Sequence, residues 1–509
     1  MVSLLGIDVS TTGAKALLID ERGEVMASAT TEYPLTSPRP MWSEQNPADW
    51  WHGVQVSVQA VLSKAGLRGS EVVGVGLTGQ MHGLVLLDAQ DQVLRPAILW
   101  NDQRTGAQCE EIIRRAGGLA QLLKHTGNTV LPGFTAPKLL WVRQHEPEVY
   151  ARVSSFLLPK DYVRLCLTGE HATDVSDASG TSLLDVKQRR WSQSMIDLLD
   201  IPRSWLPACV ESTEVAGWIT PEVGKATGLQ AGTPVIAGGG DQAAQAVGTG
   251  VVRGGIISVT LGTSGVVFAH SDHFVAEAEG RLHAFCHAVP GKWHLMGVML
   301  SAGGSFRWLR DTVCLSEKHL ASLGSKDPYD LLTCTAASAP AGSDGLIFLP
   351  YLTGERTPYP DPQARGAFVG LTTRHGRGHL IRSVMEGVSF GLRDCLELVR
   401  ALGVPIAQVR GSGGGVRSAL WRQILADVFG TELAQASVTE GAAFGAALLA
   451  GVGTGVFHSV EDAVDRTILV TQVTSPVPEN QERYERLYPI YRSLYPALTS
   501  AFSELAQQG

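Results

Sequence analysis

Two aspartates follow short apolar runs and stand beside small residues, where a carboxylate can take part in phosphate chemistry. Asp8 ends the first apolar run and is followed by the hydroxyl residues Thr11 and Thr12. A carboxylate beside hydroxyls and glycine amides is suited to hold Mg²⁺, usually through water, because Mg²⁺ keeps most of its hydration shell. An aspartate that hydrogen-bonds within its own turn is the structural alternative. Lys15 lies just beyond the turn, where it either reaches a phosphate or remains a solvated surface lysine.

Asp241 follows three consecutive glycines, Gly238 to Gly240, which themselves follow the apolar run 234–237. Glycines let a backbone approach a ligand closely, and they place Asp241 at the start of a predicted helix. An aspartate in this position is either a helix N-cap or a general base directed at a substrate. We favour the general base, because an N-cap needs no glycine triplet in front of it.

Two polar clusters interrupt apolar runs elsewhere in the first half. Met81 and His82 lie between two glycines in the segment 79–83, at a predicted strand end where α/β proteins usually bind small substrates. This placement favours contact with a substrate over a purely structural histidine. Trp100 and Asp102 belong to a similar cluster, which either binds substrate or caps the helix that follows it.

The segment around Asp8 has a counterpart about half a chain later, since residues 6–13 and 258–265 can be laid on each other. Each segment begins with apolar and β-branched residues and ends in serine, threonine and glycine, which predicts a buried strand that turns tightly into the next strand. Such a turn presents backbone N–H groups and hydroxyls, the donors that hold a phosphate. Two copies predict a duplicated domain with one phosphate-binding hairpin in each half.

A second glycine-rich segment, residues 411–418, precedes a predicted amphipathic helix. The backbone of such a turn can lie flat against a base or ribose, and a helix N-terminus favours anions. The segment does not fit the dinucleotide-binding template, and the sequence contains no Walker A motif. If the protein uses ATP, it does so without a P-loop.

The predicted elements alternate between strands and helices. Strands are expected at 4–9, 14–19, 72–77, 84–88, 235–237, 256–259 and 265–269, and helices at 47–60, 107–115, 378–398 and 418–429. A domain boundary is expected in the glycine-rich stretch 248–255. Near the C-terminus tyrosines and leucines recur at helical spacing, although Pro489 and Pro496 are expected to kink or break that helix.

The composition excludes several classes of protein. The 509 residues carry a formal net charge of −8 and no concentrated Lys/Arg run, which argues against a nucleic-acid-binding protein. The seven cysteines are scattered and never spaced as C-x-x-C, so reduced thiols in a cytosolic protein are expected and neither a disulfide framework nor a zinc site is predicted. No apolar stretch is long enough to span a membrane. We therefore expect a cytoplasmic protein.

At this point the chain resembles the FGGY carbohydrate kinases, within the sugar kinase and actin-like ATPase superfamily, and most closely the xylulokinases. The resemblance covers nearly the whole chain and rests on the motifs at 6–8 with 11–13, 42–45 with 50–51, 79–83, 100–102, 134–138, 239–241, 261–265, 349–352 with 354–358, and 413–415. The segment 134–138 reads Phe-Thr-Ala-Pro-Lys.

The resemblance implies an α/β fold with two ribonuclease H-like domains of the actin/hexokinase type around a cleft. The expected N-terminal FGGY domain, residues 1–247, holds the sugar and the first phosphate hairpin. The expected nucleotide-binding C-terminal domain covers residues 255–473, and a helical segment follows at 474–509. A homodimer is left open by the resemblance.

The resemblance also assigns roles to residues. Asp241 becomes the catalytic base, and Asp8 serves the metal, through water, and the phosphates of Mg-ATP. The sugar-binding residues are Met81, His82, Trp100, Asp102, Asp241 and Gln242; the residues for the phosphates and nucleotide are Thr11, Thr12, Lys15, Gly262, Thr263, Gly303, Arg307, Gly414, Gly415 and Ser418. Gln242 departs from the family pattern, because xylulokinases commonly have Asn beside the base.

The expected reaction is ATP-dependent phosphorylation of a ketopentose, D-xylulose to D-xylulose 5-phosphate. The first alternative is a kinase for another sugar or polyol of the same family. The second is an ATP-binding scaffold without phosphotransferase activity, which the sequence disfavours because a scaffold needs neither Asp241 nor the Met81-His82 pair.

Overall fold

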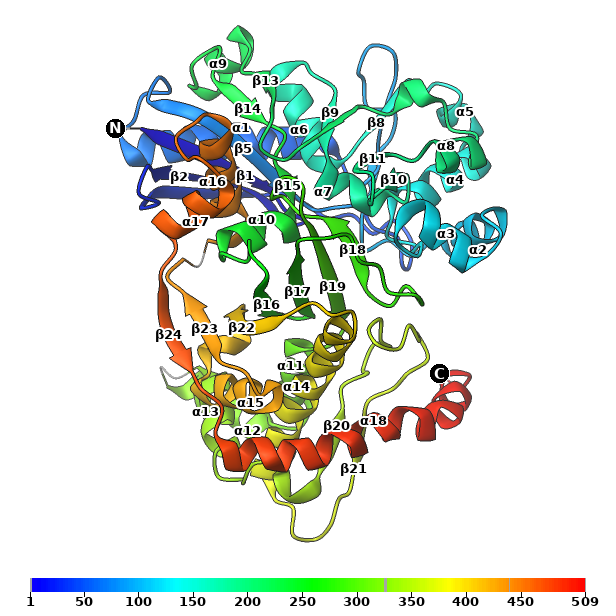
Figure 1. Ribbon diagram of the computed structural model, residues 1–509, viewed down its shortest axis with the longest axis vertical. Coiled ribbons are helices and arrows are strands. Elements are labelled where there is room, and N and C mark those ends of the chain that lie inside the picture. The colour runs from blue at the N-terminus through cyan, green and yellow to red at the C-terminus, as the bar shows by residue number, and fades with distance from the viewer. Residues whose placement is uncertain (1, 325–326, 439, 509) are drawn as a thin grey trace. The chain divides into compact units, whose positions relative to one another are not determined.

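Figure 1 shows the computed structural model, which describes residues 2–324, 327–438 and 440–508. The chain forms two compact units, and each unit is assembled from three separate stretches of sequence. Unit 1 comprises Met1–Arg253, His270–His294 and Val438–Leu469, and unit 2 comprises Gly254–Ala269, Leu295–Ser437 and Val470–Gly509.

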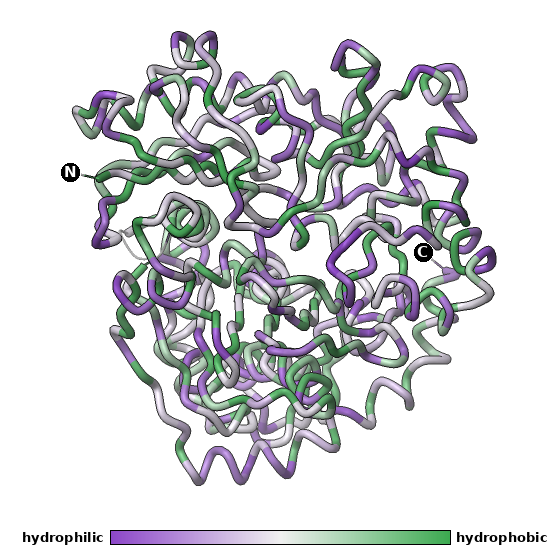
Figure 2. Tube along the Cα trace, turned by 45° about the horizontal axis from the view of Figure 1, so that its top comes forward, coloured by the Kyte–Doolittle hydropathy of each residue, from purple (hydrophilic) through white to green (hydrophobic). Residues whose placement is uncertain are grey.

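A mixed sheet forms the centre of unit 1. Its strands follow the order β13-β14-β5-β1-β2-β3, with β15 beside β5. Their bounds are β1 (Ser3–Val9), β2 (Gly13–Asp20), β3 (Val25–Glu32), β5 (Val72–Gly79), β13 (Val215–Trp218), β14 (Pro234–Ile236) and β15 (Gly239–Gly240). Strand β1 pairs antiparallel with β2 and parallel with β5. It is almost wholly buried, and the tube that leads away from the N-terminus is correspondingly green in Figure 2.

Three helices pack on this sheet: α1 (Pro47–Ala65), α10 (Asp241–Gly248) and α16 (Gly441–Gly453); α10 and α16 also pack on each other. Helix α1 begins after Asn46, whose side chain accepts a hydrogen bond from the Ala48 N–H at 3.2 Å, and it ends at Gly66 in the left-handed conformation. Helix α16 comes from the C-terminal part of the sequence and lies against β1 and β5 (Figure 1). Its small residues allow a very close approach, because a Cβ at Gly6 of β1 would lie only 1.9 Å from the Ala443 carbonyl oxygen.

The rest of unit 1 consists of short elements, several of which surround a second hydrophobic cluster. They are β4 (Glu44–Gln45), β6 (Val85–Leu87), β7 (Ala97–Ile98), α2 (Gly106–Arg115), α3 (Leu119–Thr126), α4 (Thr135–His145), α5 (Pro147–Tyr150), β8 (Ser155–Leu157), α6 (Pro159–Thr168), β9 (Ala172–Asp174), α7 (Val175–Ala178), β10 (Leu184–Asp185), β11 (Arg190–Trp191), α8 (Gln193–Leu198), β12 (Ala208–Val210), α9 (Pro221–Thr227), β18 (His283–Cys286) and α17 (Val460–Thr467), with 3₁₀ turns at Ser179–Thr181 and Arg203–Trp205.

A second mixed sheet repeats the pairing of the first. Its order is β18-β19-β17-β16-β22-β23-β24. The further strands are β16 (Gly255–Leu261), β17 (Gly265–Ser271), β19 (Trp293–Met299), β22 (Ile406–Ser412), β23 (Leu433–Ala436) and β24 (Val470–Thr474). Strand β16 pairs antiparallel with β17 and parallel with β22, as β1 pairs with β2 and β5. Both expected hairpins are therefore confirmed.

Helices and a small hairpin complete unit 2. They are α11 (Gly303–Thr312), α12 (Leu315–Leu323), α13 (Pro328–Ala336), α14 (Arg377–Ala401), α15 (Ala419–Phe429), α18 (Pro478–Ala506), β20 (Ile347–Leu349) and β21 (Ala367–Val369), with 3₁₀ turns at Ser343–Gly345 and Gly414–Arg417. Of the two expectations for Pro489 and Pro496, a break of the last helix is wrong, since α18 continues through both, and a kink stays a prediction. Both prolines are exposed, so water can reach the carbonyl groups that lose their N–H partner.

Two general features of the chain match the composition. All seven cysteines are unpaired, and four of them are buried. Among the helices of the described residues, none combines the length and the apolar character that crossing a membrane requires.

Candidate active site in unit 1 and nucleotide pocket in unit 2

The sheet of unit 1 brings the two predicted aspartates to one edge. Asp8 near the end of β1 is the register partner of Thr78 on β5, and Thr78 is in turn the partner of Gly239 on β15. Asp241 follows two residues later, as the first residue of α10. Gly238 makes this path possible, because it has a φ of 76° and a Cβ there would lie 1.9 Å from the Leu77 carbonyl oxygen.

Asp241 does not cap its helix. The N-cap is Gly240, and the Asp241 carboxylate is one residue further on. Burial, and to a smaller extent the negative charge of Asp8, raise the pKa of Asp241 to about 7, although hydrogen bonds from Gln242 oppose this shift. A carboxyl group with a pKa near neutrality is suited to accept a proton at physiological pH.

Asp8 is also held in an environment that opposes ionisation. Burial raises its pKa to about 6, although the ammonium group of Lys15 lowers it. Its Oδ1 atom is buried and has no hydrogen-bond partner among the described residues. A buried carboxylate oxygen without a partner is costly, so a ligand at this position is expected to satisfy it.

A buried charge network lies behind the glycine triplet. Lys160, Asp161, Arg164, Asp174 and Asp177 are all fully buried; the Lys160 ammonium lies 2.5 Å from an oxygen of Asp161, 2.8 Å from one of Asp174 and 3.4 Å from one of Asp177. The network includes two cationic and three acidic side chains. Desolvation raises the pKa of Asp177 well above its usual range, which favours its neutral form.

The same network holds the backbone that precedes Asp241. Asp174 accepts a hydrogen bond from the Ser176 hydroxyl at 2.5 Å, and the Ser176 hydroxyl accepts one from the Gly240 N–H at 3.1 Å. The Arg164 guanidinium donates to the Ala237 carbonyl oxygen at 3.1 Å. These bonds hold the glycine triplet at two points, at Ala237 before it and at Gly240, its last residue.

Met81 and His82 lie beside this strand end. Met81 is buried and lies against Gly240, since a Cβ at Gly240 would be 2.9 Å from the Met81 Cγ and Sδ atoms. The His82 Nδ1 atom lies 2.8 Å from the Gly180 carbonyl oxygen, and the imidazole ring stacks on Phe134 with a centroid distance of 4.6 Å. The structure therefore brings the predicted base and the predicted sugar-contact pair into one place.

Other predicted residues of unit 1 are engaged within the protein. The Trp100 indole N–H donates to the Thr11 hydroxyl at 2.9 Å, and 43 % of Trp100 stays exposed. Thr12 is exposed in the same turn. Asp102 is fully buried, and its carboxylate receives hydrogen bonds from the Arg104 side chain and the Ser43 N–H. A sugar contact of Asp102 stays a prediction, and its observed partners are structural.

Lys15 forms an ion pair with Glu440, the residue before α16. Both side chains remain about a quarter exposed, at 28 % and 27 %. A phosphate contact of Lys15 stays a prediction. The pairing of Lys15 with Glu440 could not be predicted from local sequence patterns, because 425 positions separate the two residues.

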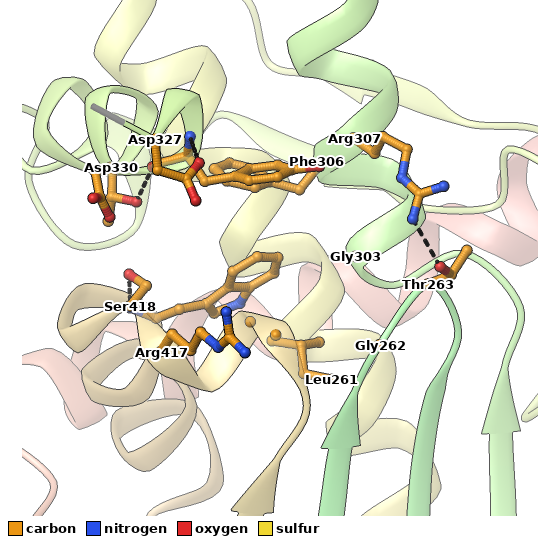
Figure 3. Close-up of a pocket in the computed structure, with 15 residues that line it drawn as sticks. Leu261, Gly262, Thr263, Gly303, Phe306, Arg307, Asp327, Asp330, Arg417 and Ser418 are labelled. Atoms are coloured by element: carbon orange, nitrogen blue, oxygen red, sulfur yellow. Dashed lines mark hydrogen bonds between the residues drawn. The ribbon is translucent and has the colours of Figure 1, made fainter. Parts of the chain in front are cut away.

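The predicted nucleotide residues of the second half surround one cavity of unit 2, with a volume of about 440 Å³. Its lining includes all seven: Gly262, Thr263, Gly303, Arg307, Gly414, Gly415 and Ser418. They come from the β16–β17 turn, from the start of α11 and from the segment that leads into α15. The Arg307 guanidinium donates to the Thr263 hydroxyl at 3.1 Å, and Figure 3 shows the two side chains directed at each other.

Several residues of this cavity were not predicted. Phe306 and Tyr329 stack with a centroid distance of 5.7 Å, and Trp421 meets Phe306 edge-on at 5.0 Å. In Figure 3, Asp327 and Asp330 lie on the opposite side of the cavity from Ser418. The aromatic residues lie on helices, where their spacing is indistinguishable from that of core residues.

The glycines of the cavity allow close contact between its walls. A Cβ at Gly303 would lie 2.4 Å from the Gly262 carbonyl oxygen, and one at Gly415 would lie 2.1 Å from a Leu261 side-chain carbon. The resulting surface combines aromatic rings, backbone amides and a guanidinium group. Such a surface suits a ligand with a planar base and anionic groups.

Comparison with known proteins places the chain in a family. Residues 3–248 match the model of the N-terminal domain of the FGGY family of carbohydrate kinases, and residues 257–454 match that of its C-terminal domain. The chain is 43% identical to a xylulose kinase of Escherichia coli strain K12, over 97% of this chain and 99% of the relative. It is 32% identical to a gluconokinase of Bacillus subtilis strain 168, over 99% and 97%.

A solved structure agrees with these relationships. The crystal structure of a xyloylose kinase from Brucella ovis superposes with a TM-score of 0.90 at 38% identity, and covers 98% of this chain and 100% of that one. The expected fold, two sheet-based α/β domains of the actin/hexokinase type, is confirmed. The chain belongs to the FGGY family of carbohydrate kinases.

Proposed function

We propose that this chain phosphorylates D-xylulose with ATP, to give D-xylulose 5-phosphate and ADP. The observation that carries the proposal is the position of Asp241: it directly follows Gly240, which lies against Met81, and its raised pKa suits a general base for a sugar hydroxyl. Full-length similarity to a xylulose kinase supports this choice of sugar.

The proposed reaction is a single displacement at phosphorus. The sugar hydroxyl oxygen forms a bond to the γ-phosphorus of ATP while the bond from that phosphorus to the ADP oxygen breaks, and the hydroxyl proton passes to the Asp241 carboxylate. Phosphoryl transfer of this kind depends mainly on alignment and charge stabilisation. Met81, His82 and Trp100 are the proposed sugar contacts, and Gln242 helps to keep the base ionised.

We propose the cavity of unit 2 as the site of the nucleotide. The aromatic side chains of Phe306, Tyr329 and Trp421 suit an adenine ring, and Arg307 and the amides of the Gly262–Thr263 turn suit phosphates. In unit 1, Thr11, Thr12 and Lys15 are the proposed phosphate contacts.

Asp8 fits a Mg²⁺ ion, bound directly or through water, because its buried Oδ1 atom lacks a partner and carboxylate oxygens are preferred ligands of Mg²⁺. A bound Mg²⁺ supplies positive charge against the phosphates of ATP. No group of three or more metal-ligating side chains occurs within the described residues, which agrees with an ion held by one carboxylate and substrate oxygens.

A substrate panel tests the proposal. ADP release, measured with a coupled assay and saturating Mg-ATP, should be fastest with D-xylulose and slower with D-ribulose, D-gluconate or glycerol. Asp241→Asn serves as the inactive control, because it preserves shape and removes the base. Fastest turnover with D-gluconate would favour the alternative of another sugar substrate, which the similarity to a gluconokinase keeps in view. ATP binding without turnover on any of these compounds would favour a scaffold.

The expected cytoplasmic location and the homodimer that the resemblance leaves open stay predictions. Cell fractionation tests the first, and light scattering on the purified protein tests the second.

A further inference from the structure

His82 has an unusual backbone conformation for a residue with a large side chain. Its φ is 69°, in the left-handed region, which residues other than glycine rarely adopt. Such a conformation costs about 1–3 kcal/mol and persists only when surrounding contacts enforce it. The contacts of the His82 carbonyl group and ring therefore show what holds this residue in place.

Two side-chain donors from one helix turn meet at the His82 carbonyl oxygen. The Thr135 hydroxyl donates to it at 3.0 Å, and the Lys138 amine donates to it at 2.8 Å. The Lys138 amine also donates to the Gly133 carbonyl oxygen, at 2.6 Å. Thr135 and Lys138 lie in the first turn of α4, and both are fully buried.

The surroundings of Lys138 disfavour its charged form. Burial lowers the pKa of its amine well below the usual range; Asp102 opposes this effect and Arg104 adds to it. The amine has at least two N–H groups in either charge state, and two carbonyl oxygens lie within hydrogen-bond distance of it. The Lys138 side chain thus joins two backbone segments as a donor.

The ring of His82 is fixed as firmly as its backbone. Phe134, the residue before Thr135, stacks on the imidazole with an interplanar angle of 18°. The Gly180 carbonyl group can only accept a hydrogen bond, so His82 Nδ1, at 2.8 Å, carries the proton. In the neutral ring Nε2 is then an acceptor, the atom type that receives a hydrogen bond from a sugar hydroxyl.

We propose that Phe134, Thr135 and Lys138 are positioning residues for His82, which fix the conformation in which its imidazole binds the sugar. This inference rests on the proposed sugar contact of His82. It gives the segment Phe134–Lys138 a role in substrate affinity, although none of its three side chains touches the sugar. The geometry explains why Thr and Lys are spaced three residues apart, since residues so spaced lie on one face of a helix.

Matched variants of Thr135 provide the first test. Thr135→Val removes the donor at nearly constant volume, and Thr135→Ser keeps it. Loss of one such hydrogen bond should raise the KM for D-xylulose roughly 3- to 10-fold in Thr135→Val. The KM for ATP should not change, and Thr135→Ser should restore the wild-type KM for D-xylulose. Lys138→Met should have a larger effect in the same direction, provided that its circular dichroism spectrum is native.

A double-mutant cycle separates positioning from general loosening of the helix. In a His82→Ala background, Thr135→Val should cause no further rise in the KM for D-xylulose, because the residue it positions is gone. Leu139→Ala is the control for stability: Leu139 belongs to the same helix and is buried in the hydrophobic cluster. It should lower the melting temperature and leave the KM for D-xylulose unchanged.

The failures of the two proposals are distinguishable. If His82→Ala raises the KM for D-xylulose while Thr135→Val and Lys138→Met do not, the sugar contact stands and the positioning role is wrong. If His82→Ala leaves that KM unchanged, the sugar contact itself is wrong and the positioning role falls with it. An equal rise in Leu139→Ala and Thr135→Val would also overturn the positioning role.

Discussion

At the scale of single residues, the two aspartates of unit 1 share one environment and differ in what they can do. Asp241 has a pKa of about 7 and Asp8 one of about 6, mainly because burial disfavours both charges. The negative charge of Asp8 also makes ionisation of Asp241 harder. The positive charge of Lys15 opposes the effect of burial at Asp8.

Asp241→Asn should lower kcat by roughly 100- to 10,000-fold, the range that a positioned general base contributes. The wild-type kcat/KM should rise with pH through about 7 and then level off, because only the ionised carboxylate accepts a proton. Initial rates from pH 5.5 to 9 check both statements. A variant that keeps more than about a tenth of the wild-type rate would remove Asp241 from this role.

Asp8→Asn should shift this pH profile toward lower pH. Removal of the Asp8 charge takes away one of the causes that raise the pKa of Asp241. The same variant should need more Mg²⁺ for half-maximal activity, because an amide oxygen is a weaker ligand than a carboxylate. A Mg²⁺ titration at saturating ATP measures the second effect. A wild-type pH profile and Mg²⁺ requirement together would make Asp8 a turn residue only.

Candidate site residues could be named from the sequence where their neighbours carry a signal, and their roles stay predictions. Asp241 follows a glycine triplet and His82 precedes Gly83, so their surroundings indicated a close backbone approach. Asp102 gave a similar signal, yet its carboxylate is paired with Arg104. The pairing of Lys15 with Glu440 depends on tertiary structure alone, and no local pattern shows it.

At the scale of elements, the contact between α10 and α16 positions the helix that begins with Asp241. The two helices meet through small residues: a Cβ at Gly445 would lie 1.8 Å from the Ala244 carbonyl oxygen, and one at Gly248 would lie 2.2 Å from that of Gly441. Backbone atoms thus touch directly, without side chains between them.

Gly445→Ala should destabilise the protein by about 1–3 kcal/mol or more, because the added methyl group meets backbone that cannot rotate away. It should also lower kcat, since α10 must shift and Asp241 moves with it. Gly106→Ala is the matched control: Gly106 is also helical, and nothing lies within 4 Å of a Cβ there. Urea unfolding and initial rates measure the two effects. Equal stability of the two variants would contradict the close contact.

A group of histidines on the segment that runs from β17 to β19 predicts sensitivity to acid. His270, His287 and His294 are almost fully buried, and burial lowers the pKa of His294 to about 3 and that of His287 well below its usual range. His287 Nδ1 accepts from the Val289 N–H at 3.1 Å, so Nε2, 3.0 Å from the Val251 carbonyl oxygen, carries the proton of the neutral ring.

Below about pH 6.5 the unfolded chain binds more protons at these histidines than the folded protein does, because folding lowers their pKa values, so they lower stability as the pH falls. His287→Gln cannot take up a proton. The stability of the wild type relative to this variant should therefore fall below pH 6.5, by at most about 1.4 kcal/mol per pH unit. Denaturant unfolding from pH 7.5 to 4.5 checks this. The raised pKa values of Asp8 and Asp241 act in the opposite direction, but they are common to both proteins and cancel. A constant difference would show that His287 is protonated when folded.

Local patterns were sufficient to predict the two hairpins and several of the helices. Both hairpins and the helices near 47–60, 107–115, 378–398 and 418–429 lie where periodicity and turn residues indicated them, with ends that differ by a few residues. Helix α16 differs, because its sequence Gly-Ala-Ala-Phe-Gly-Ala-Ala-Leu-Leu-Ala-Gly-Val-Gly is apolar on every side. A sequence of this kind predicts a buried helix, but it does not indicate which elements the helix packs against.

At the scale of the whole molecule, the chain passes between the two units after Arg253, Ala269, His294, Ser437 and Leu469. Unit 1 is therefore incomplete without the stretch 438–469, which includes α16. The core of unit 1 is therefore not formed by one continuous stretch of sequence.

A fragment of residues 1–253 should consequently fail to form a native core, because β1 and β5 lose the helix that covers them. It should bind the dye ANS and lack a near-UV circular dichroism spectrum, as expected for a state without fixed packing. The full chain is the control. A cooperative thermal transition of the fragment alone would show that α16 is dispensable for folding.

The late position of α16 in the sequence also affects folding during synthesis. During synthesis the residues of β1 emerge first, and the partners of its Gly6, Ala443 and Ala447, emerge more than 400 residues later. At about 5–20 residues per second, the face of the first sheet waits roughly 20–90 s on the ribosome before its covering helix exists. Throughout that interval the nascent chain presents bare glycine- and valine-rich strands to the cell, so holdase chaperones should set its yield more than the stability of the finished enzyme does.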